Sequence, residues 1–219
     1  VPELIGMCFS VDNTSLLPPF FPCGRNSDGL FAAMVVWLDQ SALIAHLPRA
    51  VSHLPQGDRS VGVEELYDTR PRLTELLTAV VRQATEFDAT VHAPAAWTIP
   101  HLGRQLLDLA EVDVARFEGR LEAAWAGYVS VAIGVIERSM GAAADLLPAL
   151  TQKLVDLRDC YLNGIASQHC AVPMELRDSG LEPEEALETF RRYLRLYGET
   201  LAHWPRVVDA ANALRADSK

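Results

Sequence analysis

Residues 71–81 read PRLTELLTAVV, and this stretch decides the fold class. Its apolar side chains recur at spacings of three, four and seven residues: Leu73, Leu76, Leu77, Val80 and Val81. That period places them on one face of an α-helix, which must be buried against other elements. Proline suits the first turn of a helix, so we expect a helix over about residues 71–87 that has Pro71 in its first turn and Asp68 or Thr69 as its cap.

The helical period continues through the remainder of the chain beyond about residue 60. We expect a long helical stretch over about residues 98–140, capped by Thr98 and broken at one or more of its glycines. Further helices are predicted over about residues 143–170 and 182–204, and Pro205 is expected to break or kink the last one before a final short helix. The sequence therefore predicts a mainly α protein, with a bundle of four to five helices over residues 61–219.

The first 60 residues have a different character, because they are rich in proline, glycine and short apolar runs. Residues 4–11 read LIGMCFSV and predict a buried strand that ends in a turn. Residues 16–22 read LLPPFFP, and their three prolines favour extended chain. A polar loop follows at residues 23–29, and a helix is expected over about residues 30–46, with Ser27 or Asp28 as its cap. This segment is predicted to be a short α/β piece that precedes the bundle.

Composition and charge limit the classes of function. The chain has 219 residues, of which 49% are hydrophobic, and a net charge of -10. An acidic balance argues against nucleic acid as a partner, because phosphate binding requires a basic surface. The longest strongly apolar stretch without charge, residues 123–136, is shorter than the ~18–20 residues that a membrane span requires. No basic segment precedes an apolar run at the start, so no secretory leader is expected.

The four cysteines, Cys8, Cys23, Cys160 and Cys170, form no closely spaced pair. In a chain with a good apolar core, this usage favours reduced thiols and a cytoplasmic location. A disulfide between two of the cysteines and a metal site remain alternatives.

The polar loop is the most informative stretch for function. Arg25, Asn26 and Asp28 place a guanidinium, an amide and a carboxylate within four residues, directly before a helix start. Backbone N–H groups and the positive end of the helix dipole add to this set. Sugar hydroxyls are recognised by such mixed donors and acceptors, and a carboxylate can accept a hydroxyl proton. The alternative is that Asn26 and Asp28 only form the turn and cap the helix.

The strings around this loop resemble a stretch of bacterial glycosyltransferases of the GT-A class. They read DN at 12–13, LLPPF at 16–20, GRNSDGLF at 24–31 and AHLPRAVSH at 45–53, so the resemblance covers about residues 8–59. It implies that a sugar is moved from a nucleotide-sugar donor to an acceptor hydroxyl, with a divalent metal ion, Mn²⁺ or Mg²⁺, at the donor diphosphate. The resemblance makes Asp28 the catalytic base and gives Arg25 and Asn26 contacts with acceptor or phosphate. It makes His53 a metal ligand, with His46 a weaker candidate.

The chain departs from this class in one important respect. A GT-A enzyme also has an N-terminal nucleotide-binding α/β half, usually with an Asp-x-Asp motif, and the sequence contains neither that half nor the motif. The chain also begins with Val1 rather than with methionine. We therefore expect the C-terminal portion of a glycosyltransferase, in which residues 1–60 end the catalytic fold and residues 61–219 form a helical domain.

Two other classes of function remain open. A non-catalytic binding or scaffold protein would expose an apolar groove or a dimer face, and the helical domain is a candidate surface for homo-oligomers. A cofactor-dependent oxygenase built on a helical bundle would direct a histidine such as His101, His169 or His203 into an internal cavity.

Overall fold

The computed structural model describes residues 11, 14–24, 26–39, 67–86, 94–143, 148–167 and 170–217. These residues form seven helices, which follow in chain order as α1 (Ser27–Leu38), α3 (Leu73–Glu86), α4 (Ala95–Glu111), α5 (Val114–Ala143), α6 (Pro148–Ile165), α7 (Met174–Asp178) and α8 (Pro183–Asp217). No strand occurs within these ranges. The prediction of a mainly α protein is confirmed.

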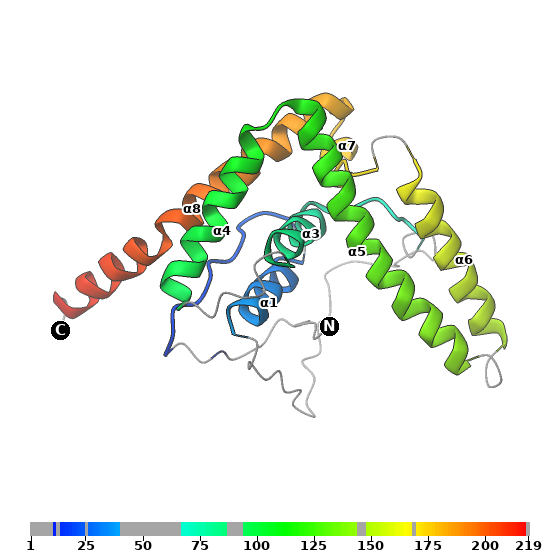
Figure 1. Ribbon diagram of the computed structural model, residues 1–219, viewed down its shortest axis with the longest axis horizontal. Coiled ribbons are helices and arrows are strands. Elements are labelled where there is room, and N and C mark those ends of the chain that lie inside the picture. The colour runs from blue at the N-terminus through cyan, green and yellow to red at the C-terminus, as the bar shows by residue number, and fades with distance from the viewer. Residues whose placement is uncertain are drawn as a thin grey trace, which may run out of the picture.

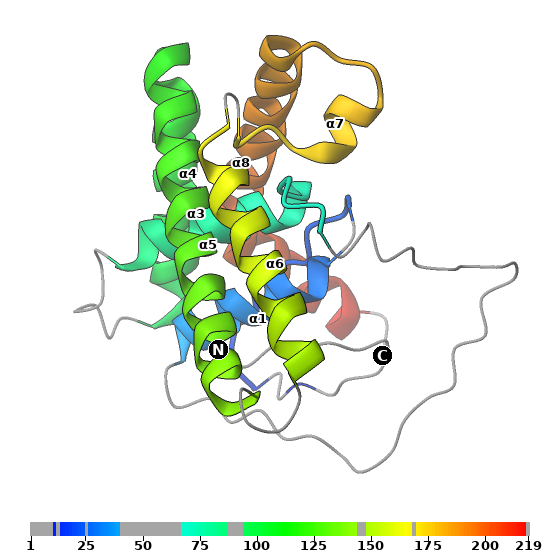
Figure 2. The same cartoon turned by 90° about the vertical axis from the view of Figure 1, so that its right-hand side faces the viewer.

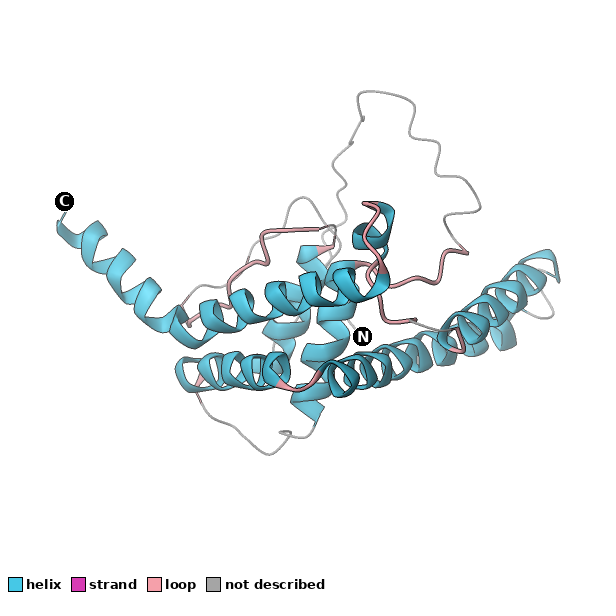
Figure 3. Ribbon diagram, turned by 90° about the horizontal axis from the view of Figure 1, so that it is seen from above, coloured by secondary structure: helices cyan, strands magenta, loops and turns pink. Residues whose placement is uncertain are grey.

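The helices form two long pairs that meet at an angle, with two shorter helices between them. Helix α4 packs along α8, and α5 packs along α6. Figure 1 shows the two pairs as the sides of an inverted V, with α1 and α3 in the space that the V encloses. Figure 2 and Figure 3 show the same arrangement from the side and from above. Helices α1 and α3 fill the space inside the V, and α4, α5 and α8 also contribute many of the buried side chains.

Helix α3 lies at the centre of the core, as its sequence pattern predicts. All five apolar side chains of the quoted stretch are at most 4% exposed. Thr74 and Thr78 on the same helix are also buried, and the Thr78 hydroxyl donates a hydrogen bond to the carbonyl of Thr74 at 2.7 Å. Helix α3 packs against both α1 and α5, and the buried Thr78 hydroxyl is satisfied by this bond within the helix.

The predicted cap of α3 is wrong in detail. The helix begins at Leu73, and the Arg72 carbonyl accepts the first helical bond, from the Leu76 N–H at 2.9 Å. Asp68 binds Arg70 instead, through the backbone N–H and the guanidinium group. The Glu75 carboxylate accepts the Arg72 N–H at 3.0 Å and so satisfies a donor that a helix start leaves open.

The closest helix contact lies where α4 crosses α8. Gly103 and Gly198 face each other there, and a Cβ atom on Gly103 would lie 2.5 Å from the Ala202 nitrogen and 2.6 Å from the Gly198 oxygen. Only glycine at these positions lets the two backbones touch. The two backbones cannot come closer than they do at this contact. The contact therefore sets the separation of the α4–α8 pair, in which both helices are long.

The long stretch predicted over residues 98–140 is two helices, and the break is not at a glycine. Helix α4 begins at Ala95, so Thr98 is inside it rather than at its cap. The chain leaves helical geometry at Val112, and Asp113 then starts α5. The Asp113 carboxylate accepts the Arg116 N–H at 3.0 Å, which is the bond of a helix cap.

The expected break at Pro205 and the separate final helix do not occur, because α8 runs through this position for 35 residues. Figure 3 shows that α8 bends in its C-terminal part, which agrees with the alternative expectation of a kink. Proline removes one hydrogen bond from a helix interior. Trp204 packs against the core beside this position, and its indole N–H binds the carbonyl of Leu17 at 2.7 Å. Tertiary contacts therefore hold the helix in place across the proline. By contrast, α6 begins at Pro148 and ends at Ile165, inside the predicted range of about residues 143–170, with proline at the first helical position.

The described part of the N-terminal segment contains extended chain and helix α1, and no strand. Phe21, Leu30, Phe31 and Met34 are buried, and α1 packs against α3. The predicted α/β piece is thus represented by its helix alone. Residues 4–10 of the predicted strand and the boundary near residue 60 lie outside the described residues, so the strand and the two-domain division remain predictions.

Two findings bear on the remaining composition arguments. None of the helices that the structure describes is both long enough and apolar enough to cross a membrane. Cys23, Cys160 and Cys170 are free thiols, which agrees with the expected absence of disulfides for these three.

Candidate functional site

The start of α1 carries two of the predicted site residues. Asn26 precedes the helix in the left-handed conformation, with φ 67°, which asparagine tolerates better than most residues. Its carbonyl accepts the Gly29 N–H at 3.1 Å. The Asp28 carboxylate in the first turn accepts the same N–H at 3.0 Å. Asn26 is exposed and Asp28 is half-buried, so both side chains lie at the solvent edge of a buried helix.

The predicted cap of α1 needs correction. Neither Ser27 nor Asp28 is the cap residue; Asn26 holds that position, and its side chain makes no capping bond. A Cβ atom on Gly29 would lie 2.7 Å from the Asn26 Oδ1 atom. The Asn26 amide therefore lies directly over Gly29, and any larger residue at 29 would push it away.

Aromatic side chains of α8 hold the segment before this loop. The Tyr197 hydroxyl donates to the carbonyl of Pro19 at 3.1 Å, and the Trp204 indole N–H donates to the carbonyl of Leu17 at 2.7 Å. The Phe20 ring stacks on Phe31 of α1, with ring centres 4.2 Å apart. These contacts position the loop at residues 23–29 relative to the bundle.

The two anchoring residues were not predicted from the sequence. Tyr and Trp often combine an apolar body with a polar tip that seeks an acceptor. That signal marks Tyr197 and Trp204 as residues with a partner, but it does not identify the carbonyls that they bind. Because of the prolines at 18 and 19, the carbonyls of this segment have no hydrogen-bond partners in a helix or a sheet. Only the tertiary structure places these carbonyls next to α8.

The remaining predicted site residues cannot be placed. Arg25, His46 and His53 lie outside the described residues, so their convergence with Asn26 and Asp28 remains a prediction. Among the residues that are described, no three His, Cys, Asp or Glu side chains form a group that could hold a metal ion. The expected divalent metal rests on His53, and its binding also remains a prediction.

A groove lies between α3, α4 and the start of α5. It has a volume of about 620 Å³, and its floor is mainly apolar. Val80, Leu106, Leu109 and Val112 contribute to the floor, while charged side chains such as Arg120 stand at the rim. Its size lies within the range of small-molecule pockets, which is ~300–1,000 Å³.

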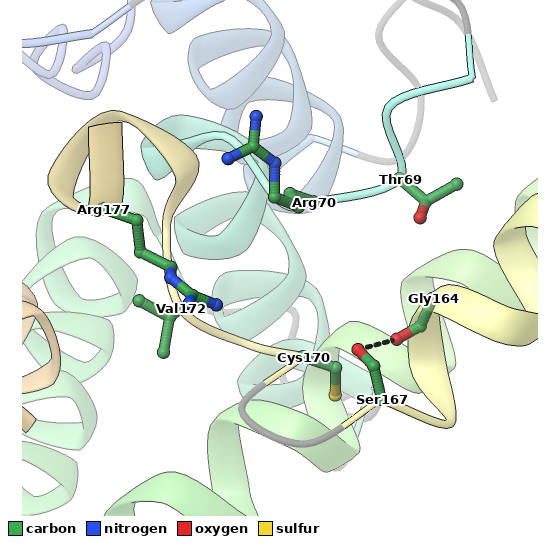
Figure 4. Close-up of a pocket in the computed structure, with 7 residues that line it drawn as sticks. All are labelled: Thr69, Arg70, Gly164, Ser167, Cys170, Val172 and Arg177. Atoms are coloured by element: carbon green, nitrogen blue, oxygen red, sulfur yellow. Dashed lines mark hydrogen bonds between the residues drawn. The ribbon is translucent and has the colours of Figure 1, made fainter. Parts of the chain in front are cut away.

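A second hollow lies between the end of α6 and α7, and its volume is only about 50 Å³. Figure 4 shows Ser167 and Cys170 on one side of it and Arg70 on the other, with the Arg70 guanidinium directed away from them. Arg70 is paired with Asp68 and Asp178, at 2.7 and 2.8 Å. Burial raises the pKa of the Cys170 thiol, which disfavours a reactive thiolate. Arg177 also lines this hollow, so the hollow offers a cation but no activated thiol.

No family model, curated protein or solved structure matches this chain.

Two of the histidines considered for a cofactor lie on the surface. His101 and His203 are exposed, on α4 and α8. The His101 ring contacts Gln105 one turn later at 3.2 Å. Neither points into an internal cavity, so the oxygenase alternative rests on His169, which lies outside the described residues.

Proposed function

We propose that this chain carries the acceptor-facing end of a glycosyltransferase. The resemblance of residues 8–59 supports the class of enzyme, and the position of Asn26 and Asp28 at the solvent edge of α1 supports the site. In this proposal, the Asp28 carboxylate takes the proton of the acceptor hydroxyl as its oxygen bonds to the anomeric carbon of the donor sugar. The bond from that carbon to the diphosphate breaks, and nucleoside diphosphate leaves.

The roles of the other residues follow from their chemistry. The exposed Asn26 amide can both donate to and accept from a sugar hydroxyl, and Arg25 would contact the acceptor or a phosphate. A divalent ion would neutralise the leaving diphosphate, with His53 as the ligand that this chain supplies. The cytoplasm is the proposed location, supported by the three free thiols.

Acceptor binding tests the proposal without requiring a donor. We would record saturation-transfer NMR spectra of the chain with a panel of simple methyl glycosides. At least one glycoside is expected to bind, and Asn26→Gly and Asp28→Asn are each expected to weaken its binding by about tenfold, the loss of one good hydrogen bond to a charged or oriented group. Asn26→Gly is a clean probe, because glycine also adopts the positive φ of this position.

Asp39→Asn is the matched control, since Asp39 is an exposed carboxylate at the other end of α1. The Asp39→Asn variant should bind the glycoside as tightly as the wild type does. If no glycoside binds, or if all three variants bind alike, the acceptor site is not at the start of α1.

A second candidate function is assembly through the α5–α6 pair. Helix α6 has no fully buried residue, and Val131, Val135, Leu150 and Leu162 on this pair are 43–48% exposed. Two helices cannot enclose a core, whereas two such pairs from two copies make a four-helix bundle. We infer that copies of the chain associate there. Light scattering over a concentration series tests this, because association raises the mean mass.

A further inference from the structure

Two glutamates from different helices bind the first turn of α3. Glu75 accepts the Arg72 N–H at 3.0 Å, and Glu175 of α7 accepts the neighbouring Leu73 N–H at 2.9 Å. The Met174 N–H also donates to the carbonyl of Pro71 at 2.9 Å. Helix α7 is thus fastened to the start of α3, and both carboxyl groups lie at the same helix turn.

One oxygen of this arrangement lacks a partner. The Oε1 atom of Glu175 is buried and makes no hydrogen bond with any residue that the structure describes. A buried acceptor without a donor is costly, and a carboxylate oxygen more so than a neutral one. An ionised Glu75 beside it would add repulsion between two negative charges. A protonated Glu75 would remove that repulsion and supply an O–H donor.

The surroundings raise the pKa of Glu75. Burial is the main cause that raises the pKa of Glu75, and the charges of Glu175 and Asp68 raise it further. The Arg72 N–H and the Arg72 charge act in the opposite direction without cancelling the effect. From α6, Tyr161 faces the same group, and burial together with the Glu75 charge raises the pKa of Tyr161. Arg70, the other nearby cation, is paired with Asp68 and Asp178.

We propose that Glu75 and Glu175 share one proton, with the Glu75 carboxyl donating its O–H to Oε1 of Glu175. The shared proton comes from solvent, and no covalent bond between heavy atoms forms or breaks. The pair is a pH-sensitive fastening between α3 and α7, and it tightens as the pH falls. This inference does not depend on the proposed glycosyltransferase function.

The direction in which the stability changes with pH follows from the linkage between protonation and folding. Because the pKa of Glu75 is higher in the folded chain, the folded state binds more protons than the unfolded state above the ordinary carboxyl range. The stability that the pair contributes is fully present below the unfolded pKa. It is lost as the pH rises through the folded pKa.

Carboxyl ¹³C NMR of the whole wild-type chain tests the pair directly. Glu75 is expected to titrate clearly above an exposed glutamate. Glu175→Gln should shift its midpoint down by at least half a pH unit, since it removes the neighbouring charge. Denaturant unfolding across pH 4 to 8 should show that Glu75→Gln, which keeps a donor at all pH values, abolishes the loss of stability on raising the pH.

Glu185→Gln is the matched control. Glu185 accepts the N–H of Glu182, three residues earlier, at the start of α8, but it is exposed. Its replacement should leave the pH profile unchanged. A Glu75 that titrates like an exposed glutamate in the wild-type chain would overturn the proposal, and so would a midpoint that Glu175→Gln does not move. The wild-type titration decides the matter even if a variant fails to fold.

Discussion

Tyr197 links the helical part of the chain to the segment that carries Asn26 and Asp28. Its hydroxyl donates to the carbonyl of Pro19, its ring packs edge-to-face on Phe21, and the side chain is 3% exposed. Burial raises the pKa of Tyr197, so the hydroxyl remains a donor at any ordinary pH. One side chain thus satisfies a buried carbonyl and fills part of the core.

Tyr197→Phe tests how much this bond contributes. The ring stays, but the buried Pro19 carbonyl loses its donor, so we expect a loss of ~1–3 kcal/mol in the free energy of unfolding. Urea denaturation measures it. Tyr193→Phe is the control, since Tyr193 is half-buried on the same helix and makes no hydrogen bond through its hydroxyl to the described residues. Equal effects of the two changes would contradict a specific role for Tyr197.

At the scale of elements, the glycines have opposite environments in two helix pairs. Gly103 of α4 touches the backbone of α8, whereas Gly119, Gly127 and Gly141 of α5 have no atom within 4 Å of an added Cβ. The first glycine is required by packing. The α5 glycines only weaken the helix, because glycine is a poor helix former.

The same substitution in the two helices should therefore have opposite effects. Gly103→Ala forces α4 and α8 apart and is expected to cost at least ~1–3 kcal/mol of stability, as overpacking of a core does. Gly127→Ala should raise stability by up to ~1 kcal/mol, because alanine is the better helix former. Thermal unfolding followed by circular dichroism measures both. A similar change in both variants would show that the α4–α8 contact is looser than described.

At the scale of the whole molecule, the two sides of the V are unequally covered. The α4–α8 pair is closed by α1, α3 and the proline-rich segment, and its central residues are buried. Among the helices that the structure describes, none packs against the far half of the α5–α6 pair (Figure 1). Apolar side chains are therefore left exposed there, although the chain carries a net charge of -10.

Charge placed on this exposed surface should prevent association. Val131→Lys puts a cation in the centre of the proposed contact, so the mean mass from light scattering is expected to fall to that of one chain. Val114→Lys is the control, because Val114 is 53% exposed at the other end of α5 and lies away from α6. Association that survives Val131→Lys would place the contact elsewhere.

Local signals in the sequence predicted several features correctly. The apolar face of residues 73–81 and the mainly α class both follow from spacing and backbone preference. The predictions of a cap at Thr98, of a break at Pro205 and of the cap of α1 were wrong. Each concerned a helix end, where one or two hydrogen bonds of small net energy compete with tertiary packing.

The candidate site also has a part that the sequence predicted and a part that it could not predict. The string at residues 24–29 predicted that Asn26 and Asp28 lie close together, since residues two positions apart in a chain are necessarily near each other. It could not indicate that Tyr197 and Trp204 hold this segment, or that Glu175 reaches the start of α3 across 102 residues.

The sequence by itself determined where helices form and which faces are apolar, because these depend on residues within a few positions of each other. Only the tertiary structure decided which helices pair, which glycines touch a backbone and which backbone N–H groups a distant carboxylate binds. Those contacts join residues far apart in the chain, and their energies depend on burial that no local pattern contains.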